Sequence, residues 1–246
     1  MTPPLWLGQT WLAPKYLGAL FSGLLLTAWL AFLVCLLATL LGVVLTAMTE
    51  SRYLGLRSAA RFFISVHRNT PLMVQVLLWY FGVPNLLPEE AMLWLNTPHT
   101  LALPLGLEPA WPSYEFLSAW ISLSLYSASF IAGELASGLR AVSHGQREAA
   151  RALGLRPWQE LRHVILPQAL AYVRQPLIGQ YTGAIKNTSL TMAIGVAELS
   201  YRSRQVESET LLTFQAFAVA TALYLLLILA SQWFGHSQKP IWGASR

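Results

Sequence analysis

The sequence predicts an all-α integral membrane protein with about five transmembrane helices, organised as a single domain over residues 1–246. Hydrophobic residues make up 55% of the chain, charged residues only 11%, and the mean hydropathy is +0.48. This is the composition of a membrane protein. The charges also gather between long apolar runs, above all in a basic stretch at residues 140–168. The predicted spans are residues 17–48, 62–86, 115–137, 175–199 and 211–234.

The first apolar run is the longest. No charged side chain occurs between residues 16 and 49, which is enough chain for a spanning helix with slack at both ends. Ala19, Gly23 and Thr27 stand four residues apart. They form a stripe of small side chains against which another helix can pack closely. Residues 1–14 contain no Lys or Arg and do not resemble a signal peptide.

The second span is predicted to follow a short polar link at residues 50–61. Pro71 and Pro84 are expected to kink or end helices in this region. Residues 84–112 then combine many prolines with two tryptophans, and tryptophan favours the interface between membrane and water. We expect an external hairpin there.

The third span carries two adjacent stripes of small residues, which predict tight packing and are compatible with a subunit interface. The stripes are Ala128, Ala132 and Ala136, and Ser129, Gly133 and Ser137. The fourth span holds Lys186 near its centre. A short polar loop, residues 202–209, is expected to separate it from the fifth span.

The basic stretch 140–168 is predicted to form two short amphipathic helices in water. It contains five Arg and two Glu. The alanines near residue 150 favour helix, and Gly154 is a natural position for the chain to turn, in a left-handed or crowded conformation. Pro157 suits the first turn of the second helix, whereas Pro167 is expected to end or kink what precedes it.

The distribution of Lys and Arg predicts the orientation of the chain. If residues 140–168 are cytoplasmic, that side carries eleven: three in the 50–61 link, six from Arg140 to Arg174 and two in the tail. The outer side carries three. Positive charge is expected inside, so the N-terminus is predicted outside and the C-terminus in the cytoplasm. Topology thereby accounts for the net charge of +5, and no nucleic-acid partner is expected.

No enzyme active site is predicted. The eleven acidic residues include no Asp, and the five His are scattered without ligand spacing, so neither a Ser/His/Asp arrangement nor a metal site is expected. Cys35 is the single cysteine of the sequence, so no disulfide framework is possible. No P-loop occurs, and this chain is not expected to hydrolyse ATP.

Within the basic stretch, Glu148-Ala149-Ala150 is followed by Gly154 and then by Val164-Ile165-Leu166-Pro167. This pattern resembles the EAA loop of permease subunits of bacterial ABC importers, in which Ile usually stands at the position of Val164. The resemblance implies the ABC importer permease fold, with the loop as the cytoplasmic coupling element that docks into a groove of the ATPase. The implied coupling residues are Glu148, Ala149, Ala150, Arg151, Gly154 and Pro167.

Two further segments resemble the polar amino-acid permeases, and within them the glutamate/aspartate type. They run from His67 to Gln75, with the sequence HRNTPLMVQ, and from Lys186 to Leu190, with the sequence KNTSL. The resemblance extends from about residue 17 to 235 and implies an amino-acid substrate. The candidates for its pathway are Arg68, Asn69, Gln75, Glu134, Lys186, Asn187, Thr188 and Ser189.

Each pathway candidate has a structural alternative. A charge at mid-bilayer costs about 2.5–3.5 kcal/mol on insertion scales, so Lys186 is expected to face the bundle interior or water. It either attracts a substrate carboxylate or is held by carbonyl groups, Glu134 or Glu198. Arg68 either snorkels to the cytoplasmic face or reaches the pathway. Glu134 is expected to pack against a polar partner, and the uncharged candidates can form hydrogen bonds between helices instead.

The predicted function is import of polar amino acids, with glutamate and aspartate suggested, across the bacterial inner membrane by alternating access. The resemblance implies two ABC ATPase subunits, a second permease subunit that is identical or related, and a periplasmic solute-binding protein. No cofactor is expected in this chain, because the ATPases would bind ATP. The alternatives are a permease for another small polar solute and a non-transporting scaffold that recruits a cytoplasmic ATPase. A secondary transporter is disfavoured because it needs no ATPase-docking loop.

Overall fold

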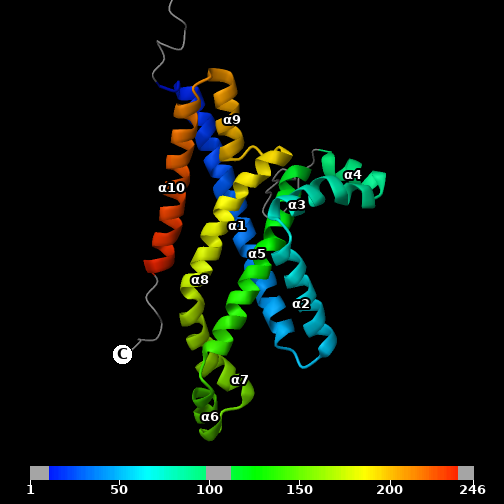
Figure 1. Ribbon diagram of the computed structural model, residues 1–246, viewed down its shortest axis with the longest axis vertical. Coiled ribbons are helices and arrows are strands. Elements are labelled where there is room, and N and C mark those ends of the chain that lie inside the picture. The colour runs from blue at the N-terminus through cyan, green and yellow to red at the C-terminus, as the bar shows by residue number, and fades with distance from the viewer. Residues whose placement is uncertain (1–10, 98–111, 238–246) are drawn as a thin grey trace, which may run out of the picture. The chain divides into compact units, whose positions relative to one another are not determined.

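The structure, a computed structural model, describes residues 11–97 and 112–237, and every regular element in these ranges is a helix (Figure 1). The chain divides into two compact units. Among the described residues, the first unit comprises 11–34, 70–97, 112–124 and 185–227, and the second comprises 35–69, 125–184 and 228–237. Residues 98–111 of the predicted external hairpin and the tail charges Lys239 and Arg246 lie outside the described residues.

The helices up to residue 97 are α1 (Pro14–Thr49), α2 (Leu54–Asn69), α3 (Leu72–Leu77), the π-helix η2 (Leu78–Gly82), the 3-10 helix η3 (Val83–Leu86) and α4 (Glu89–Asn96). Those that follow are α5 (Tyr114–Ala141), α6 (His144–Ala152), α7 (Pro157–Glu160), the π-helix η5 (Leu161–Ile165), α8 (Leu166–Asn187), the 3-10 helix η6 (Thr188–Ile194), α9 (Leu199–Thr210) and α10 (Thr213–Ser237). Three stretches in the described ranges are long and apolar enough to cross a membrane: α1, α5 and residues Thr213–Trp233 of α10. The count of five spans stays a prediction.

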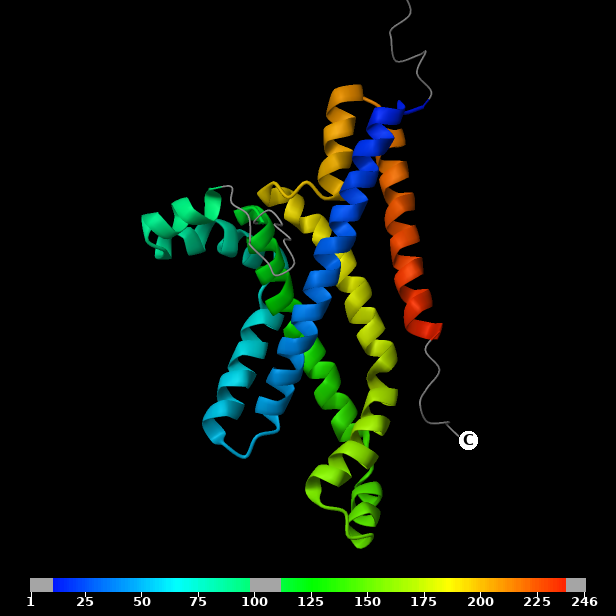
Figure 2. The ribbon, with the colours of Figure 1, turned by 180° about the vertical axis from the view of Figure 1, so that it is seen from behind.

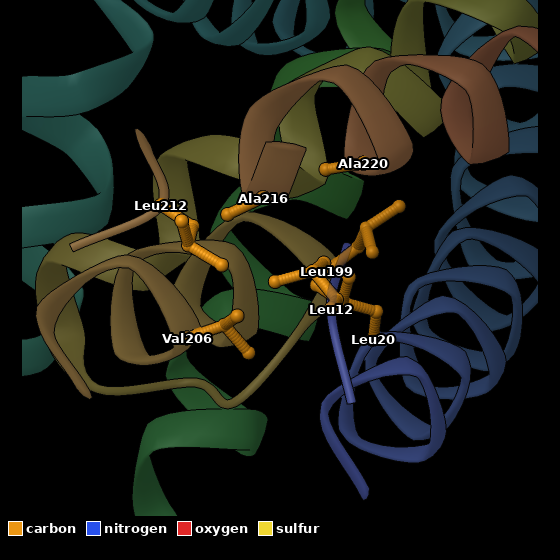
Figure 3. Packing of buried hydrophobic residues seen from close by; sticks show 7 residues of the cluster. All are labelled: Leu12, Leu20, Leu199, Val206, Leu212, Ala216 and Ala220. Carbon is orange, nitrogen blue, oxygen red and sulfur yellow. The ribbon is translucent and has the colours of Figure 1, made fainter. Parts of the chain in front are cut away.

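The core of the first unit lies where α9 packs beside the N-terminal part of α1 and the beginning of α10 (Figures 1 and 2). Leu20, Leu199 and Val206 are buried there almost completely. Figure 3 shows them together with Leu12, Leu212, Ala216 and Ala220. The apolar side chains of these three helices thus form one cluster.

The small-residue stripe of α1 faces α9. A Cβ added at Gly23 would lie 2.9 Å from the Cα of Leu199 and 2.9 Å from the Cγ of Arg202, so only glycine allows this approach. Thr27 lies one turn after Gly23 on α1, and its Oγ1 accepts a hydrogen bond from the backbone N–H of Leu199, with an N–O distance of 3.1 Å. The close packing predicted for this stripe is confirmed.

The polar loop predicted at residues 202–209 is wrong, because these residues belong to helix α9. Glu198 caps its N-terminus: the carboxylate accepts hydrogen bonds from the backbone N–H of Ser200 at 2.9 Å and of Tyr201 at 2.8 Å. Leu199, Ser203 and Val206 are buried and recur at helical spacing. The four charged residues occupy the other positions of an amphipathic helix.

The fourth predicted span, 175–199, is not one continuous helix. α8 begins earlier, at Leu166, and changes at Thr188 into the 3-10 helix η6, which ends at Gly195 with a left-handed φ of 88°. The hydroxyl groups of Thr188, Ser189 and Thr191 each donate to the carbonyl oxygen three residues earlier, at 2.7 Å. Such bonds compete with the α-helical pattern, which accounts for the change.

The second predicted span, 62–86, divides at Pro71. The helix α2 ends at Asn69, because the residue before a proline disfavours helical dihedral angles and proline lacks the N–H. In the first unit, Nε2 of Gln75 donates to the carbonyl oxygen of Thr70 at 3.1 Å and to its Oγ1 at 2.7 Å. Most of the predicted polar link at residues 50–61 is also helical, since α2 begins at Leu54.

The second unit has its own core, formed by α1, α2 and α5. Ala38 and Leu45 of α1 bury against Ala60 of α2 and against Ala128, Ile131 and Ala132 of α5. Oγ1 of Thr46 lies 3.3 Å from the carbonyl oxygen of Ala132, to which it donates. The stripe that begins at Ala128 therefore packs against α1 of the same chain, and a subunit interface is not needed to bury it.

Candidate coupling loop and transport pathway

The turn between α6 and α7 is built around Gly154. Its φ is +75°, and an added Cβ would meet nothing within 4 Å, so the position is left-handed and not crowded. The N–H of Gly154 donates to the carbonyl of Arg151 at 2.9 Å, and the N–H of Leu155 donates to that of Ala150 at 3.2 Å. These two bonds form a Schellman motif, the common way in which a helix ends at a left-handed glycine. The predicted turn is confirmed.

The second short helix begins as its sequence predicts. Pro157 stands in the first turn of α7, and Oε1 of Gln159 accepts a hydrogen bond from the backbone N–H of Arg156 at 2.9 Å. Pro167 does not end the helix that precedes it. It lies in the first turn of α8, directly after the π-helix η5. A local π-turn accommodates a residue that cannot donate in the α-helical pattern.

The two helices are held together by an ion pair that the sequence patterns do not predict. Arg151 Nε lies 3.0 Å from Oε2 of Glu160, and Arg151 Nη2 lies 3.5 Å from Oε1. Glu160 is only 5% exposed. In addition, Arg147 Nη2 donates to the carbonyl oxygen of Leu139 at the end of α5, at 2.7 Å. The sequence feature that points to Glu160 as an ion-pair partner is its position as the second acidic residue of the basic stretch.

The outer surface of the loop combines charge with apolar side chains. The side chain of Glu148 is 65% exposed, and its Oε1 lies 3.2 Å from Nδ1 of His144, which is itself exposed. Leu153 is 81% exposed and Trp158 is 64% exposed. Ala149 is exposed, whereas Ala150 is buried. α6 and α7 lie side by side (Figure 1), so the loop presents a compact surface with a carboxylate and two large apolar groups.

Among the pathway candidates in the first unit, Lys186 is exposed in the last turn of α8. It forms no ion pair within the described part of the chain. The Glu198 carboxylate accepts hydrogen bonds from the amides of α9 and from the hydroxyl of Tyr224, at 2.7 Å. Thr188 is fully buried, and its hydroxyl, like that of Ser189, donates to the backbone of its own segment. Asn187 is half-buried beside them.

In the second unit, Arg68 and Asn69 line one open cavity of about 560 Å³. Nδ2 of Asn69 donates to the backbone oxygen of Ser65 at 2.8 Å. Glu134, on α5, accepts a hydrogen bond from Nε2 of Gln180 at 3.3 Å. Glu134 thus has the polar partner that the sequence predicted. The pathway roles of all these residues remain predictions.

Helices long enough to span a bilayer, joined by a loop of two short helices, are the architecture of a membrane-embedded protein. The chain belongs to the family described as "Binding-protein-dependent transport system inner membrane component", which matches residues 38–240. The family consists of transport components of the inner membrane and not of enzymes, so the predicted class of protein and its membrane are confirmed.

Relatives across the length of the chain agree with this family. The glutamate/aspartate import permease protein GltJ of Escherichia coli (strain K12) is 26% identical over 212 residues, which cover 86% of this chain and 82% of the relative. The octopine transport system permease protein OccM of Rhizobium meliloti is 30% identical over 244 residues, which cover 99% and 91%.

The fold also matches a solved structure. The crystal structure of an amino acid ABC transporter with histidines superposes with a TM-score of 0.74 and 27% sequence identity, covering 90% of this chain and 93% of that chain. The predicted ABC importer permease fold and the resemblance to amino-acid permeases are therefore confirmed.

Proposed function

We propose that the chain is the permease subunit of an ATP-binding-cassette importer that carries polar amino acids with an anionic side chain, such as glutamate and aspartate. The family supports a transport subunit that works with an ATPase and a binding protein. The names of the relatives support an amino acid or amino-acid derivative as substrate. The proposed preference for a substrate with an acidic side chain is based on one residue of this chain, Lys186.

Lys186 is the single charge in the sequence from residue 175 to 197. A lysine within an apolar segment needs a partner or water, and it marks a substrate or ion path by default. Its ammonium is exposed and has no carboxylate partner among the described residues. The negative end of α8 stabilises it while no substrate is present. An anionic amino acid supplies the missing carboxylate.

The coupling loop would transmit the ATPase cycle to this site. Its exposed carboxylate and its two exposed apolar residues, Glu148, Leu153 and Trp158, suit a groove on a cytoplasmic ATPase subunit. Two ATPases would bind the ATP, since this chain contains no P-loop. Because five helices give half a pathway, a second permease subunit would complete it. A periplasmic solute-binding protein would deliver the amino acid, with the N-terminus outside and the C-terminus in the cytoplasm.

Uptake by the reconstituted complex tests the proposal. Vesicles are given labelled glutamate, aspartate, glutamine or arginine, with Lys186→Gln, Lys186→Arg and the control Lys15→Gln, which removes an exposed charge at the start of α1. We expect glutamate and aspartate to be preferred. A hydrogen bond to a charged group contributes about 1.5–3 kcal/mol, so Lys186→Gln is expected to raise the apparent KM for glutamate by at least tenfold, and Lys186→Arg by much less.

Two results would contradict this function. Preference of the wild-type complex for glutamine or arginine would contradict the proposal that the substrate has an anionic side chain, and the chain would then belong to an importer of another polar solute. ATPase binding without uptake of any amino acid would favour a scaffold. If Lys186→Gln lowers the stability of the complex in detergent and leaves the apparent KM unchanged, the lysine has a structural role.

A further inference from the structure

One cavity of the second unit is lined by two arginines, two other polar residues and two apolar ones, and no carboxylate borders it in the part of the chain that the structure describes. Its lining residues are Arg61, Ile64, Ser65, Arg68 and Asn69 of α2 and Phe130 of α5. Neither arginine takes part in an ion pair among the residues that the structure describes. The positions of Arg61, Ser65 and Arg68 differ by four and three residues, so they share one face of α2. Two guanidinium groups therefore border the same space, and neither has a carboxylate partner within the described ranges.

The position of Arg68 is fixed by α5. Its Cζ lies 4.8 Å from the centre of the Phe130 ring, a cation–π contact. A Cβ added at Gly133 would lie 2.8 Å from Nη1 of Arg68, so the glycine leaves room for the guanidinium. Arg68 is exposed, but an arginine side chain that is stacked on a ring in this way loses less freedom on binding an anion than one without such a contact. The contacts with α5 thus hold this guanidinium at the edge of the open cavity.

Planar guanidinium groups suit phosphate oxygens, to which they donate two hydrogen bonds in parallel. Arg61 and Arg68 are two helical turns apart, about 10 Å along the axis, and both side chains are long enough to converge on an anion between them. The hydroxyl of Ser65 stands between the two arginines on the same face. A phosphate group is therefore the ligand that this arrangement fits in charge and shape.

The strip of α2 next to this face is apolar and exposed. Phe62 and Val66 follow Arg61 and Ser65 by one position each, and they are 72% and 40% exposed. An amphiphile with an anionic head and acyl chains would cover both strips, whereas a free amino acid or free phosphate would cover only the basic one. Basic pockets between membrane helices on the cytoplasmic side bind the headgroups of anionic lipids. We infer that the cavity at Arg61 and Arg68 binds the phosphate of an anionic phospholipid.

Binding of a short-chain lipid to the purified full-length chain in neutral detergent tests the inference. The probe is dioctanoyl phosphatidylglycerol, compared with dioctanoyl phosphatidylcholine, inorganic phosphate and L-glutamate as competitors. Arg61→Gln and Arg68→Gln are each expected to weaken phosphatidylglycerol binding at least fivefold. Gly133→Ala leaves the charge unchanged but displaces the guanidinium of Arg68, and we expect a similar loss. The matched control Arg52→Gln removes an exposed arginine outside the cavity and should bind within twofold of wild type.

Four results would overturn the inference. Equal binding of phosphatidylcholine would show that the site does not require an anionic headgroup. Wild-type binding by both Arg61→Gln and Arg68→Gln would show that the lipid binds elsewhere. Displacement of the lipid by inorganic phosphate at equal concentration would assign the cavity to a soluble anion. Displacement by L-glutamate would assign it to the substrate. Selective loss in the three cavity variants, with neither soluble competitor effective, supports the lipid site.

Discussion

The guanidinium of Arg151 and the carboxylate of Glu160 join the two helices of the coupling loop, with 3.0 Å between Nε and Oε2. Glu160 is buried, whereas the side chain of Arg151 is 64% exposed. A buried carboxylate requires a partner with which it is hydrogen-bonded. The ion pair and the backbone turn at Gly154 therefore both constrain the angle between α6 and α7. Arg151, which the resemblance assigns to ATPase coupling, has this contact within the loop itself, and its role toward the ATPase stays a prediction.

Removing either partner of this pair should weaken ATPase docking. Glu160→Gln keeps the size of its side chain and Arg151→Gln shortens it; both lose the charge attraction, so the loop surface becomes less ordered. Because each variant breaks the same contact, the double variant is expected to bind the ATPase no more weakly than the single ones. Coupling energies of contacting residues are about 0.5–3 kcal/mol. Titration of the ATPase subunit onto the four complexes in detergent measures this.

Glu207→Gln is the control for that experiment, since it removes a carboxylate 3.5 Å from Arg204 on α9, outside the loop. It should leave ATPase affinity unchanged. Strictly additive losses in the double variant would mean that Arg151 and Glu160 act on the ATPase separately, and that the ion pair does not shape the loop.

Substitution of Gly154 tests the turn itself. Its φ of +75° is left-handed, and a side chain there costs about 1–2 kcal/mol even without a clash. Gly154→Val should therefore misdirect α7 and reduce uptake, while membrane insertion stays normal. Gly154→Asn should retain most activity because Asn tolerates this conformation. Gly145→Val is the matched control, since Gly145 lies within α6 and has free space around it. Equal uptake by Gly154→Val and Gly145→Val would contradict a left-handed turn.

Local sequence patterns predicted the features of this protein that depend on local chemistry. The long apolar runs correspond to α1, α5 and α10, and glycine and proline at residues 154 and 157 mark the turn and the second helix of the loop. The small-residue stripe of α1 also predicted close packing. In each case the information lies within a single segment of the sequence, as its apolar residues, a residue that suits a special dihedral angle, or its small side chains.

Contacts between distant segments were not predictable from these patterns. The sequence of α9 predicts a polar loop because its four charged residues outweigh its few apolar ones, and its partner Thr27 on α1 is remote in sequence. The Arg151–Glu160 pair spans a turn whose geometry decides whether the groups meet. The cavity at Arg68 depends on Phe130 and Gly133 of another helix. Each unit also combines segments from separate parts of the chain.

The predicted orientation can be measured by cysteine labelling. Asn96→Cys and His144→Cys, each in a Cys35→Ser background, place one thiol at an exposed position of α4 or α6. An impermeant maleimide added to intact spheroplasts should react with the first and not with the second, because the excess of positive charge places α6 in the cytoplasm. Both should react after permeabilisation. The reverse pattern would overturn the orientation and the docking of a cytoplasmic ATPase on α6.

The contact between α1 and α9 can be tested with two glycines of the same helix. Gly23 is buried, and an added Cβ would lie 2.9 Å from the Cα of Leu199, a backbone atom that cannot rotate away. Gly18 is exposed, and a Cβ added there would meet nothing within 4 Å. Overpacking of a close contact costs about 1–3 kcal/mol, so Gly23→Leu should lower the unfolding temperature in detergent by several degrees. Gly18→Leu should leave it unchanged.

A third variant separates this contact from a general effect of size. Thr27→Val is close to Thr in volume but removes the oxygen that accepts the N–H of Leu199, and an unsatisfied buried donor costs about 1–3 kcal/mol. It should therefore be less stable than wild type although it adds no bulk. If Gly23→Leu and Thr27→Val both unfold at the temperature of Gly18→Leu, α9 does not pack on this stripe, and its helical structure must depend on the Glu198 cap and on α10 instead.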